Sequence, residues 1–552
     1  MIKLLSKKSA LCAMLIFTSV LVSSASDACT LVMAGKKATA TGDVMVSYTC
    51  DGWYDHRLVV VPGKDNKDGT TTPIYKDGCI QTRPDRKLLK VGDIPEAKKT
   101  YTYFHVGYPI MNEKSVVIGE HTWGGRDESE CPTAMMMIEQ LEALGLQRGA
   151  TARETVQIMG ALAEKYGYAD GGEALGVADK NEVWLFEITG PGPLWNTKSG
   201  KPGAVWAAVR IPDDKYAMGA NRSRIGEIDF NDKANFMYSS NIKDVAKDMG
   251  WWKEGEKFVF HEIYDPEVEG RSPYICQRRE WRAYNLLSPS VKLAENSKAY
   301  YPLFQKPDKP IELKDLMNLN RDYLEGTRFD LTKGLAAGPF GSPMRNTVGK
   351  PQKPENRKGN DWNRPISIYR CSFSIVSQIR DNMPEEIAAL TWFGLDQPST
   401  CVYMPVYAGT KSLPASLAVY DRAKFNKDST YWAFNLVGNW ASLKYSYMIK
   451  DIRAKQSELE NGFFKSAPAA EKAFMQKYSA NKKDEAAKDL TLYVNDNVNK
   501  VHTEWWNLAW HLIGKYADGY VIDDKGKATT VGYPTEWLTE VGFGNNDAEP
   551  KK

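Results

Sequence analysis

The segment that decides the interpretation of this chain is residues 23–34, SSASDACTLVMA, in which small residues lead into Cys29 and an apolar β-type stretch. Upstream, three lysines within the first eight residues precede an apolar run over residues 10–22. This order is typical of a secretory signal peptide, and the run is too short to span a bilayer. We therefore predict a leader over residues 1–28 and a mature protein that is periplasmic or secreted.

Two cleavage points fit the small-x-small rule for signal peptides. Cleavage after Ala28 makes Cys29 the first residue of the mature chain. Cleavage after Ala25 leaves a stub of residues 26–28 that further trimming has to remove. The sequence does not decide between the two, but in both cases a cysteine stands at the processing point.

Three interpretations of Cys29 compete. A lipoprotein anchor should follow an aliphatic residue three positions back, where this chain has Ser26, with the charged Asp27 beside it. A structural half-cystine is ordinary in a secreted protein. An N-terminal nucleophile carries its own base, because a free α-amine has a pKa of about 7.7–8.0 and accepts the thiol proton. We favour the nucleophile and keep a lipid-anchored binding protein as an alternative.

The cysteine count agrees with a reactive thiol. Loss of the leader removes Cys12 and leaves seven cysteines: Cys29, Cys50, Cys79, Cys131, Cys276, Cys371 and Cys401. Seven is odd, so at least one thiol stays unpaired unless chains are cross-linked. The sequence has no convincing His cluster, no Cys pair separated by two residues and no phosphate loop. We therefore predict no metal and no cofactor.

Composition restricts the class of protein. The chain has 552 residues, of which 42% are apolar and 26% charged, an ordinary globular balance. Lys and Arg number 72 against 69 acidic residues, so charge does not point to nucleic acid or to a membrane surface. After the leader we find no run of about 18 apolar residues, so no stable membrane insertion is expected. Whether the chain works as a monomer or a homo-oligomer stays open.

The residues after Cys29 predict a β-hairpin, with strands over 30–34 and 44–49. If its turn centres near Ala40, Cys29 lies opposite Asp51. That acid could hold the terminal ammonium or order the site. Alternatively, Asp51 begins an Asp-Gly pair that only ends the strand.

Further along, helical and strand patterns alternate. We expect helices over 133–146 and 151–166, strands over 174–178, 182–188 and 204–209, and an exposed loop over 349–361. Thr151 and Glu154 form a capping box at the start of the second helix. From 443 to 516 the pattern is helical, with Trp505, Trp506 and Trp510 interpreted as packing first and as a ligand surface second. Sheets flanked by helices suit this order.

A series of short motifs follows Cys29 in a fixed order. They include CT at 29–30, GKKA at 35–38, MNE at 111–113, GE at 119–120, TARE at 151–154, ANxxRI at 220–225, YxEGTxFD at 323–330, GPxGSP at 338–343, FGLD at 393–396 and DIR at 451–453. Together they resemble the bacterial dipeptidase A family of N-terminal-nucleophile cysteine peptidases. The resemblance extends from Cys29 to about Phe464.

The resemblance implies an α+β fold, a four-layer αββα N-terminal-nucleophile sandwich over residues 29–442, with a helical C-terminal region over 443–552. It also implies that dipeptides are the substrates. Cys29 would attack the carbonyl, its amine would carry the proton, and water would release the thioester. An amidase of the same mechanism, acting on N-acyl amino acids or other amides, is the alternative enzyme.

Three further residues are candidates for the site. By resemblance to the related bile-salt and penicillin amidases, Asn221 is a candidate oxyanion donor. Arg364 could supply positive charge, and Glu120 could bind the ammonium of a substrate. The alternatives are a turn-stabilising Asn221, a surface ion pair at Arg364 and a structural acceptor at Glu120.

The chain also departs from the family at two positions. Family members often carry Arg where this chain has Tyr48, and Asp where it has Cys50. The site therefore has one cation and one acid fewer. A disulfide between Cys50 and Cys29 would silence the enzyme, whereas a free Cys50 would be a harmless buried thiol, and the sequence leaves both open.

Overall fold

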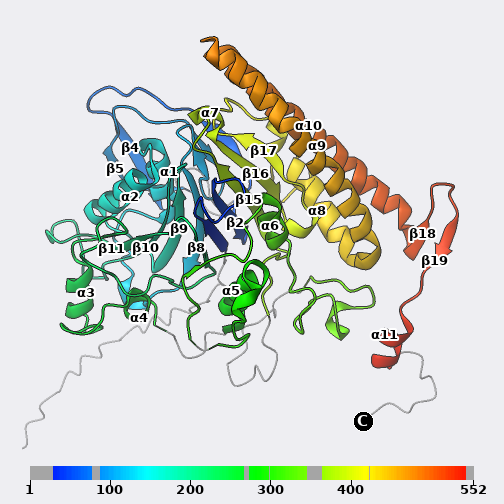
Figure 1. Cartoon of the computed structure of the whole chain (residues 1–552), viewed down its shortest axis with the longest axis horizontal. Coiled ribbons are helices and arrows are strands. Elements are labelled where there is room, and N and C mark those ends of the chain that lie inside the picture. The colour runs from blue at the N-terminus through cyan, green and yellow to red at the C-terminus, as the bar shows by residue number, and fades with distance from the viewer. Residues whose placement is uncertain are drawn as a thin grey trace, which may run out of the picture.

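The computed structural model describes residues 29–76, 88–266, 273–297, 299–344, 363–421 and 423–542 (Figure 1). The expected leader and the expected loop over 349–361 lie outside these residues. Two large sheets form the centre of the molecule, and helices surround them (Figure 1). Because sheets and helices both contribute to one continuous core, the chain is α+β, as predicted.

The first sheet has seven antiparallel strands in the order β14-β12-β1-β2-β15-β16-β17. Their bounds are β1 Thr30–Ala34, β2 Val44–Asp51, β12 Tyr216–Gly219, β14 Phe304–Gln305, β15 Cys371–Ile379, β16 Ala389–Leu395 and β17 Met404–Tyr407. The predicted N-terminal hairpin, β1 and β2, therefore lies inside the sheet. Its neighbours on both sides come from much later in the chain, and every residue of the hairpin strands is buried.

The second sheet has eight strands in the order β13-β11-β10-β9-β8-β7-β6-β3. Their bounds are β3 Val59–Val61, β6 Tyr103–His105, β7 Met111–Asn112, β8 Val117–Trp123, β9 Gly172–Ala178, β10 Val183–Thr189, β11 Val205–Arg210 and β13 Phe236–Tyr238. The strands predicted over 174–178, 182–188 and 204–209 are confirmed as β9, β10 and β11. Two small sheets pair β4 (Thr71–Lys76) with β5 (Leu89–Pro95), and β18 (Tyr520–Ile522) with β19 (Ala528–Thr530).

Glycines let the two large sheets pack face to face. A Cβ atom on Gly119 of β8 would lie 2.8 Å from Leu31 Cδ1 of β1 and 3.0 Å from Tyr48 Cβ of β2. A Cβ atom on Gly176 of β9 would lie 2.8 Å from Met33 Sδ. Any side chain at these two positions would push the sheets apart, so the close approach depends on glycine.

Helices cover the outer faces of both sheets (Figure 1). The second sheet is covered by α1 (Ile138–Arg148) and α2 (Ala152–Tyr166). On the first sheet, α6 (Leu313–Asn320) packs against β2 and β15. The remaining shorter helices are α3 Ile242–Asp248, α4 Phe260–Tyr264, α5 Pro273–Leu287, α7 Glu385–Ala388 and α11 Thr535–Glu540.

Both predicted N-terminal helices are present. Half of the predicted capping box at α2 is formed, because the N-cap Thr151 accepts through Oγ1 from the backbone N–H of Glu154 at 3.2 Å. The other half differs, because Glu154 Oε2 accepts from the N–H of Ala150 at 2.8 Å and not from that of Thr151. Helix α1 begins later than expected because Met136, just before it, forms a β-bridge with Tyr168.

Two long helices, α9 Tyr445–Ser479 and α10 Lys483–Lys515, form the helical region predicted from 443 to 516, and α8 Thr430–Ala441 comes just before it. Helix α10 packs on α8, α9 and β17. The packing role predicted for Trp505 is confirmed, since it is fully buried and stacks on Phe434 with ring centroids 5.0 Å apart. Trp510 is instead 52% exposed. Among the described residues, no helix combines the length and apolarity that crossing a bilayer requires.

The hairpin register differs from the expected one. Thr30 pairs with Thr49, so continuing the register sets Cys29 opposite Cys50 and not opposite Asp51. The connection is no tight turn but a loop over residues 35–43, anchored where Thr39 forms a β-bridge with Ile311. The loop is centred between residues 39 and 40 and not on Ala40, so the pairing differs by one residue from the expected one.

The face-to-face packing yields a stability prediction. Gly119→Ala should lower the free energy of unfolding by about 1–3 kcal/mol, because the new methyl group overpacks the interface between the sheets. Chemical denaturation measures this change. Gly462→Ala in α9 is the matched control, since a Cβ there meets nothing within 4 Å and should stabilise the helix by up to about 1 kcal/mol. Equal effects of the two substitutions would contradict the close approach of the sheets.

Candidate active site

Cys29 lies directly before β1, at the end of a central strand, and is fully buried. Its Sγ is 3.8 Å from the hydroxyl of Tyr48 and in hydrogen-bond contact with Cys50. Both cysteines are free thiols in the structure. Burial raises the pKa of the Cys29 thiol well above its usual value, and the contact with Cys50 and the charge of Glu120 raise it further. The thiol therefore needs a base before it can react.

An arginine that the sequence analysis did not single out fixes the backbone of Cys29. Arg279 on α5 donates through Nη1 to the carbonyl oxygen of Cys29 at 2.7 Å and to Thr30 Oγ1 at 2.8 Å. Through Nη2 it donates to the side-chain oxygen of Asn221. Arg279 is fully buried. One planar guanidinium thus connects the candidate nucleophile with the candidate oxyanion donor.

Asn221 follows β12 with φ at 65°, a left-handed conformation that asparagine tolerates better than most residues. Because Arg279 donates to its Oδ1, the amide orientation is fixed with Nδ2 as the donor. Nδ2 donates to the carbonyl oxygen of Thr122 at 2.7 Å. An amide nitrogen carries two hydrogens, so one N–H remains to serve a further acceptor.

Asp51 and Arg364 form a buried ion pair, with Arg364 Nη2 2.6 Å from Asp51 Oδ2. The alternative of a surface ion pair at Arg364 is therefore wrong. Burial and the neighbouring Arg279 lower the pKa of Arg364 to about 9, which leaves it charged at neutral pH. Burial raises the pKa of Asp51, while Arg364 and Arg279 oppose that rise. Arg364 Nη1 also lies 3.5 Å from Asn221 Oδ1.

Glu120 lies on β8, whose inner neighbours are the strands of the hairpin. Its Oε2 accepts from the Tyr48 hydroxyl at 3.0 Å, and its Oε1 accepts from Thr122 Oγ1 at 3.1 Å. The carboxyl group is also in hydrogen-bond contact with Cys29, and burial raises its pKa. Tyr48 thus bridges the thiol and this acid.

The structure brings all five predicted residues together, although they come from distant parts of the chain. Asp51, Asn221 and Arg364 are connected to Cys29 through Arg279, and Glu120 is connected to it directly and through Tyr48. Sequence reasoning missed Arg279. Its available signal is the charged run QRREWR over residues 277–282, whose members are nearly all buried.

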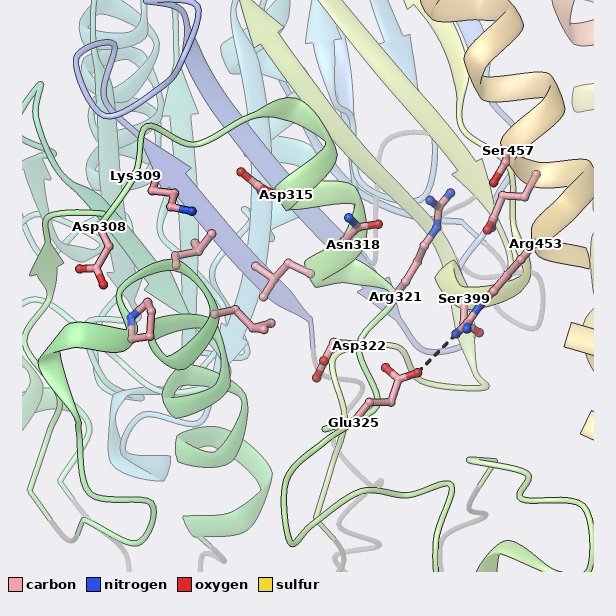
Figure 2. A pocket seen from close by; sticks show the side chains of 15 residues that line it. Asp308, Lys309, Asp315, Asn318, Arg321, Asp322, Glu325, Ser399, Arg453 and Ser457 are labelled. Atoms are coloured by element: carbon pink, nitrogen blue, oxygen red, sulfur yellow. Dashed lines mark hydrogen bonds and ion pairs between the residues drawn. The ribbon is translucent and has the colours of Figure 1, made fainter. Parts of the chain in front are cut away.

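A separate cavity of about 760 Å³ lies between α5, α6 and α9 (Figure 2). None of the five predicted residues is among its described lining residues. Figure 2 shows Arg453 paired with Glu325 at 3.3 Å on its wall. Asp322 on the same wall accepts from Arg282, which is one turn from Arg279 on α5. The cavity therefore lies beside α5, the helix that carries Arg279, but none of the five predicted site residues is among its described lining residues.

Comparison with known families agrees with the ordered motifs. The model of peptidase family C69 matches residues 28–458. The chain belongs to peptidase family C69. This confirms the family resemblance predicted from the sequence, and makes the protein a hydrolase of peptide bonds. The matched region contains every residue of the Cys29 site and ends inside α9.

Three relatives of this C69 peptidase illustrate the similarity. A probable dipeptidase of Latilactobacillus sakei is 26% identical over 455 residues, which cover 80% of this chain and 83% of that protein. A probable dipeptidase of Salmonella dublin is 26% identical over 402 residues, 70% of this chain and 82% of the relative. A probable dipeptidase B of Lactococcus lactis is 26% identical over 495 residues, 82% and 91% of the two chains.

The position of Arg279 predicts a loss of peptidase activity on substitution. Arg279→Lys keeps the charge but cannot bond Cys29 and Asn221 at once, so kcat should fall about 100-fold through misplacement of the site. Arg278→Lys is the matched control, because Arg278 is buried on the same helix but donates to Asn363 at 2.9 Å. Kinetics below the unfolding temperature of both variants measure the difference. Similar kcat values for the two variants would refute a positioning role.

Proposed function

We propose that this C69 peptidase is a cysteine dipeptidase in which removal of the leader makes Cys29 the N-terminal nucleophile. The observation that carries the proposal is the place of Cys29, buried at the start of the central strand β1, with its carbonyl held by Arg279 and its sulfur beside Glu120. The family match and the relatives described as probable dipeptidases support the substrate class.

The α-amine of Cys29 is the base in this mechanism. Burial raises the pKa of the thiol, so little thiolate exists at neutral pH without a proton acceptor. A free α-amine has a pKa of about 7.7–8.0, and a useful fraction of it is neutral at pH 7. The amine takes the thiol proton as sulfur attacks the substrate carbonyl, and returns it to the leaving amine. Water then releases the acyl group from the thioester.

Positive and polar groups around Cys29 support this step. The free N–H of Asn221 Nδ2 is the proposed oxyanion donor, and its direction is fixed by Arg279 and Thr122. Arg364 balances the charge of Asp51 and adds positive potential beside Asn221. Glu120 binds the ammonium of the substrate's first residue, since it lies in contact with the attacking sulfur.

The burial of Cys29 and Glu120 argues against a lipid-anchored binding protein and against an amidase for N-acyl substrates. A lipid anchor on Cys29 would have to leave a fully buried position at the centre of a sheet. An N-acyl substrate brings no cation to the buried Glu120, whereas the ammonium of a dipeptide does.

The proposal extends to processing and architecture. We assign residues 1–28 to a leader that directs the protein to the periplasm or the exterior. We assign the two facing sheets and their covering helices to the αββα sandwich of N-terminal-nucleophile hydrolases, over residues 29–442. We assign residues 443–552 to its C-terminal extension, whose described part consists mainly of α9 and α10 and also contains the β18–β19 pair.

Replacing the nucleophile tests the reaction. Cys29→Ser should lower kcat on alanyl-alanine at least about 100-fold, because a hydroxyl is a much weaker nucleophile beside the same amine. Cys131→Ser is the matched control: Cys131 is also buried, belongs to a separate small cluster with Trp195, and should leave kcat unchanged. Near-normal turnover by Cys29→Ser would rule out the mechanism.

The mature N-terminus tests processing. We expect the intact mass and N-terminal sequence to begin at an unblocked Cys29, and iodoacetamide to add one label there with loss of dipeptide hydrolysis. A chain that begins at Ser26 should be inactive until it is trimmed. A lipidated Cys29, or an active chain with residues before Cys29, would contradict the role of the α-amine.

A further inference from the structure

A second buried glutamate, Glu173, lies beside Glu120 on the same face of the sheet. In the pairing of β8 with β9, Thr122 lies opposite Glu173, and Glu120 lies opposite Leu175. Directly opposed residues point to the same face of a sheet, so Glu120, Thr122 and Glu173 share one face. The carboxyl groups of Glu120 and Glu173 are in hydrogen-bond contact with each other. Both are buried.

Two buried carboxyl groups in contact cannot both ionise, and they share one proton. Glu120 accepts hydrogen bonds from two hydroxyls, Tyr48 and Thr122, which favour its ionised form. Charge from Glu120 and from Asp170 raises the pKa of Glu173 beyond the effect of burial. The shared proton therefore resides mainly on Glu173, and the pair carries one negative charge.

The described side chains that interact with this pair include no cation, and the α-amine of Cys29 is neutral in the state that accepts the thiol proton. These side chains are Cys29, Tyr48 and Cys50 from the hairpin, Tyr108 before β7, Glu139 and Glu142 on α1, and Tyr168 and Asp170 before β9. All of these described neighbours are acids, phenols or thiols. A single buried negative charge in such surroundings is costly unless a cation binds.

Several acceptors nearby have no donor. Glu173 Oε2 and both carboxyl oxygens of Glu142 are buried and receive no N–H or O–H from the described residues. Glu142 is fully buried on α1, near enough to Glu120 for the charge of Glu120 to raise its pKa. These buried acceptors are thus available to a donor that arrives with a ligand. A primary ammonium brings three N–H donors and one positive charge.

The attacking sulfur lies at the right place for such a ligand. In a dipeptide, the ammonium nitrogen is two bonds from the carbonyl carbon that sulfur attacks. Glu120 contacts both Cys29 and Glu173, so an ammonium held by the pair leaves the first carbonyl beside the thiol.

We propose that Glu120 and Glu173 act as one proton-sharing carboxyl pair that binds the free α-ammonium of a dipeptide, and that this pair excludes N-acylated substrates. The inference rests on the proposed function. It adds Glu173 as a specificity-determining residue, with Glu142 as the acid behind it.

The proposal predicts an asymmetry between two isosteric substitutions. Glu173→Gln reproduces the protonated acid, because the amide donates to Glu120 and its oxygen still accepts from the ligand. Glu120→Gln removes the charge itself. Glu173→Met keeps the volume but removes both the donor and the acceptor.

The experiment compares alanyl-alanine with propionyl-alanine, which differs only in lacking the amine, on the mature enzyme. We expect a preference of at least about 100-fold in kcat/KM for alanyl-alanine in the unaltered enzyme. Glu120→Gln should reduce this preference about 100-fold, and Glu173→Met about 10-fold, mainly through KM. Glu173→Gln should keep it within about threefold. Glu164→Gln, at a half-buried acid of α2 that accepts from Trp206, is the matched control and should change nothing.

The other outcomes would overturn either the carboxyl-pair inference or the proposed function, and they distinguish the two. An unaltered preference in Glu120→Gln, or equal losses for both substrates in Glu173→Met, would overturn the inference and leave the nucleophile intact. If Glu173→Met does not fold, the two Gln variants decide, because equal losses in both would contradict the asymmetry. An enzyme that hydrolyses neither compound would refute the proposed function itself.

Discussion

The guanidinium of Arg279 holds the site together, because it bonds the carbonyl of Cys29, the hydroxyl of Thr30 and the amide of Asn221 at once. A buried cation is costly, and here its charge is offset by Asp51 and by carbonyl oxygens aimed at it. Losing any of these partners leaves a charge in the core without compensation. The position of the thiol and the direction of the Asn221 amide therefore depend on one side chain of α5.

The packing of the two sheets serves the same site. Gly119 and Gly176 let β8 and β9 approach the hairpin closely, which brings Glu120 near enough to Cys29 for its charge to raise the pKa of the thiol. Tyr48 fills the remaining space and bonds both groups. The reactive thiol thus has cations and an amide on one side and acids and phenols on the other. A zwitterionic substrate matches this division of charge.

The sequence predicts features that depend on neighbouring residues, and it misses features that depend on contacts between residues far apart in the chain. Cys29 was proposed from a local signal, at the junction between small residues and a strand. The N-cap bond of Thr151 at the start of α2 is local as well. The predicted hairpin register was wrong, and the loop that sets it is bridged through Thr39 to Ile311, far away in the chain. Arg279 was missed because its partners lie about 250 and 58 residues away, and a charged run in a helix ordinarily indicates an exposed face. Asp51 and Arg364 were proposed separately, and only the fold shows them paired.

The neighbours of the hairpin also have a consequence for folding kinetics. Strand β2 pairs with β15, and Asp51 meets Arg364 across 313 residues of chain. Contacts of such high sequence separation form slowly and late, since the intervening loop must first be ordered. The surroundings of Cys29 are therefore incomplete until most of the polypeptide has been made. Cys29, which directly precedes β1, is therefore among the last residues to reach its final environment, although it is near the start of the chain.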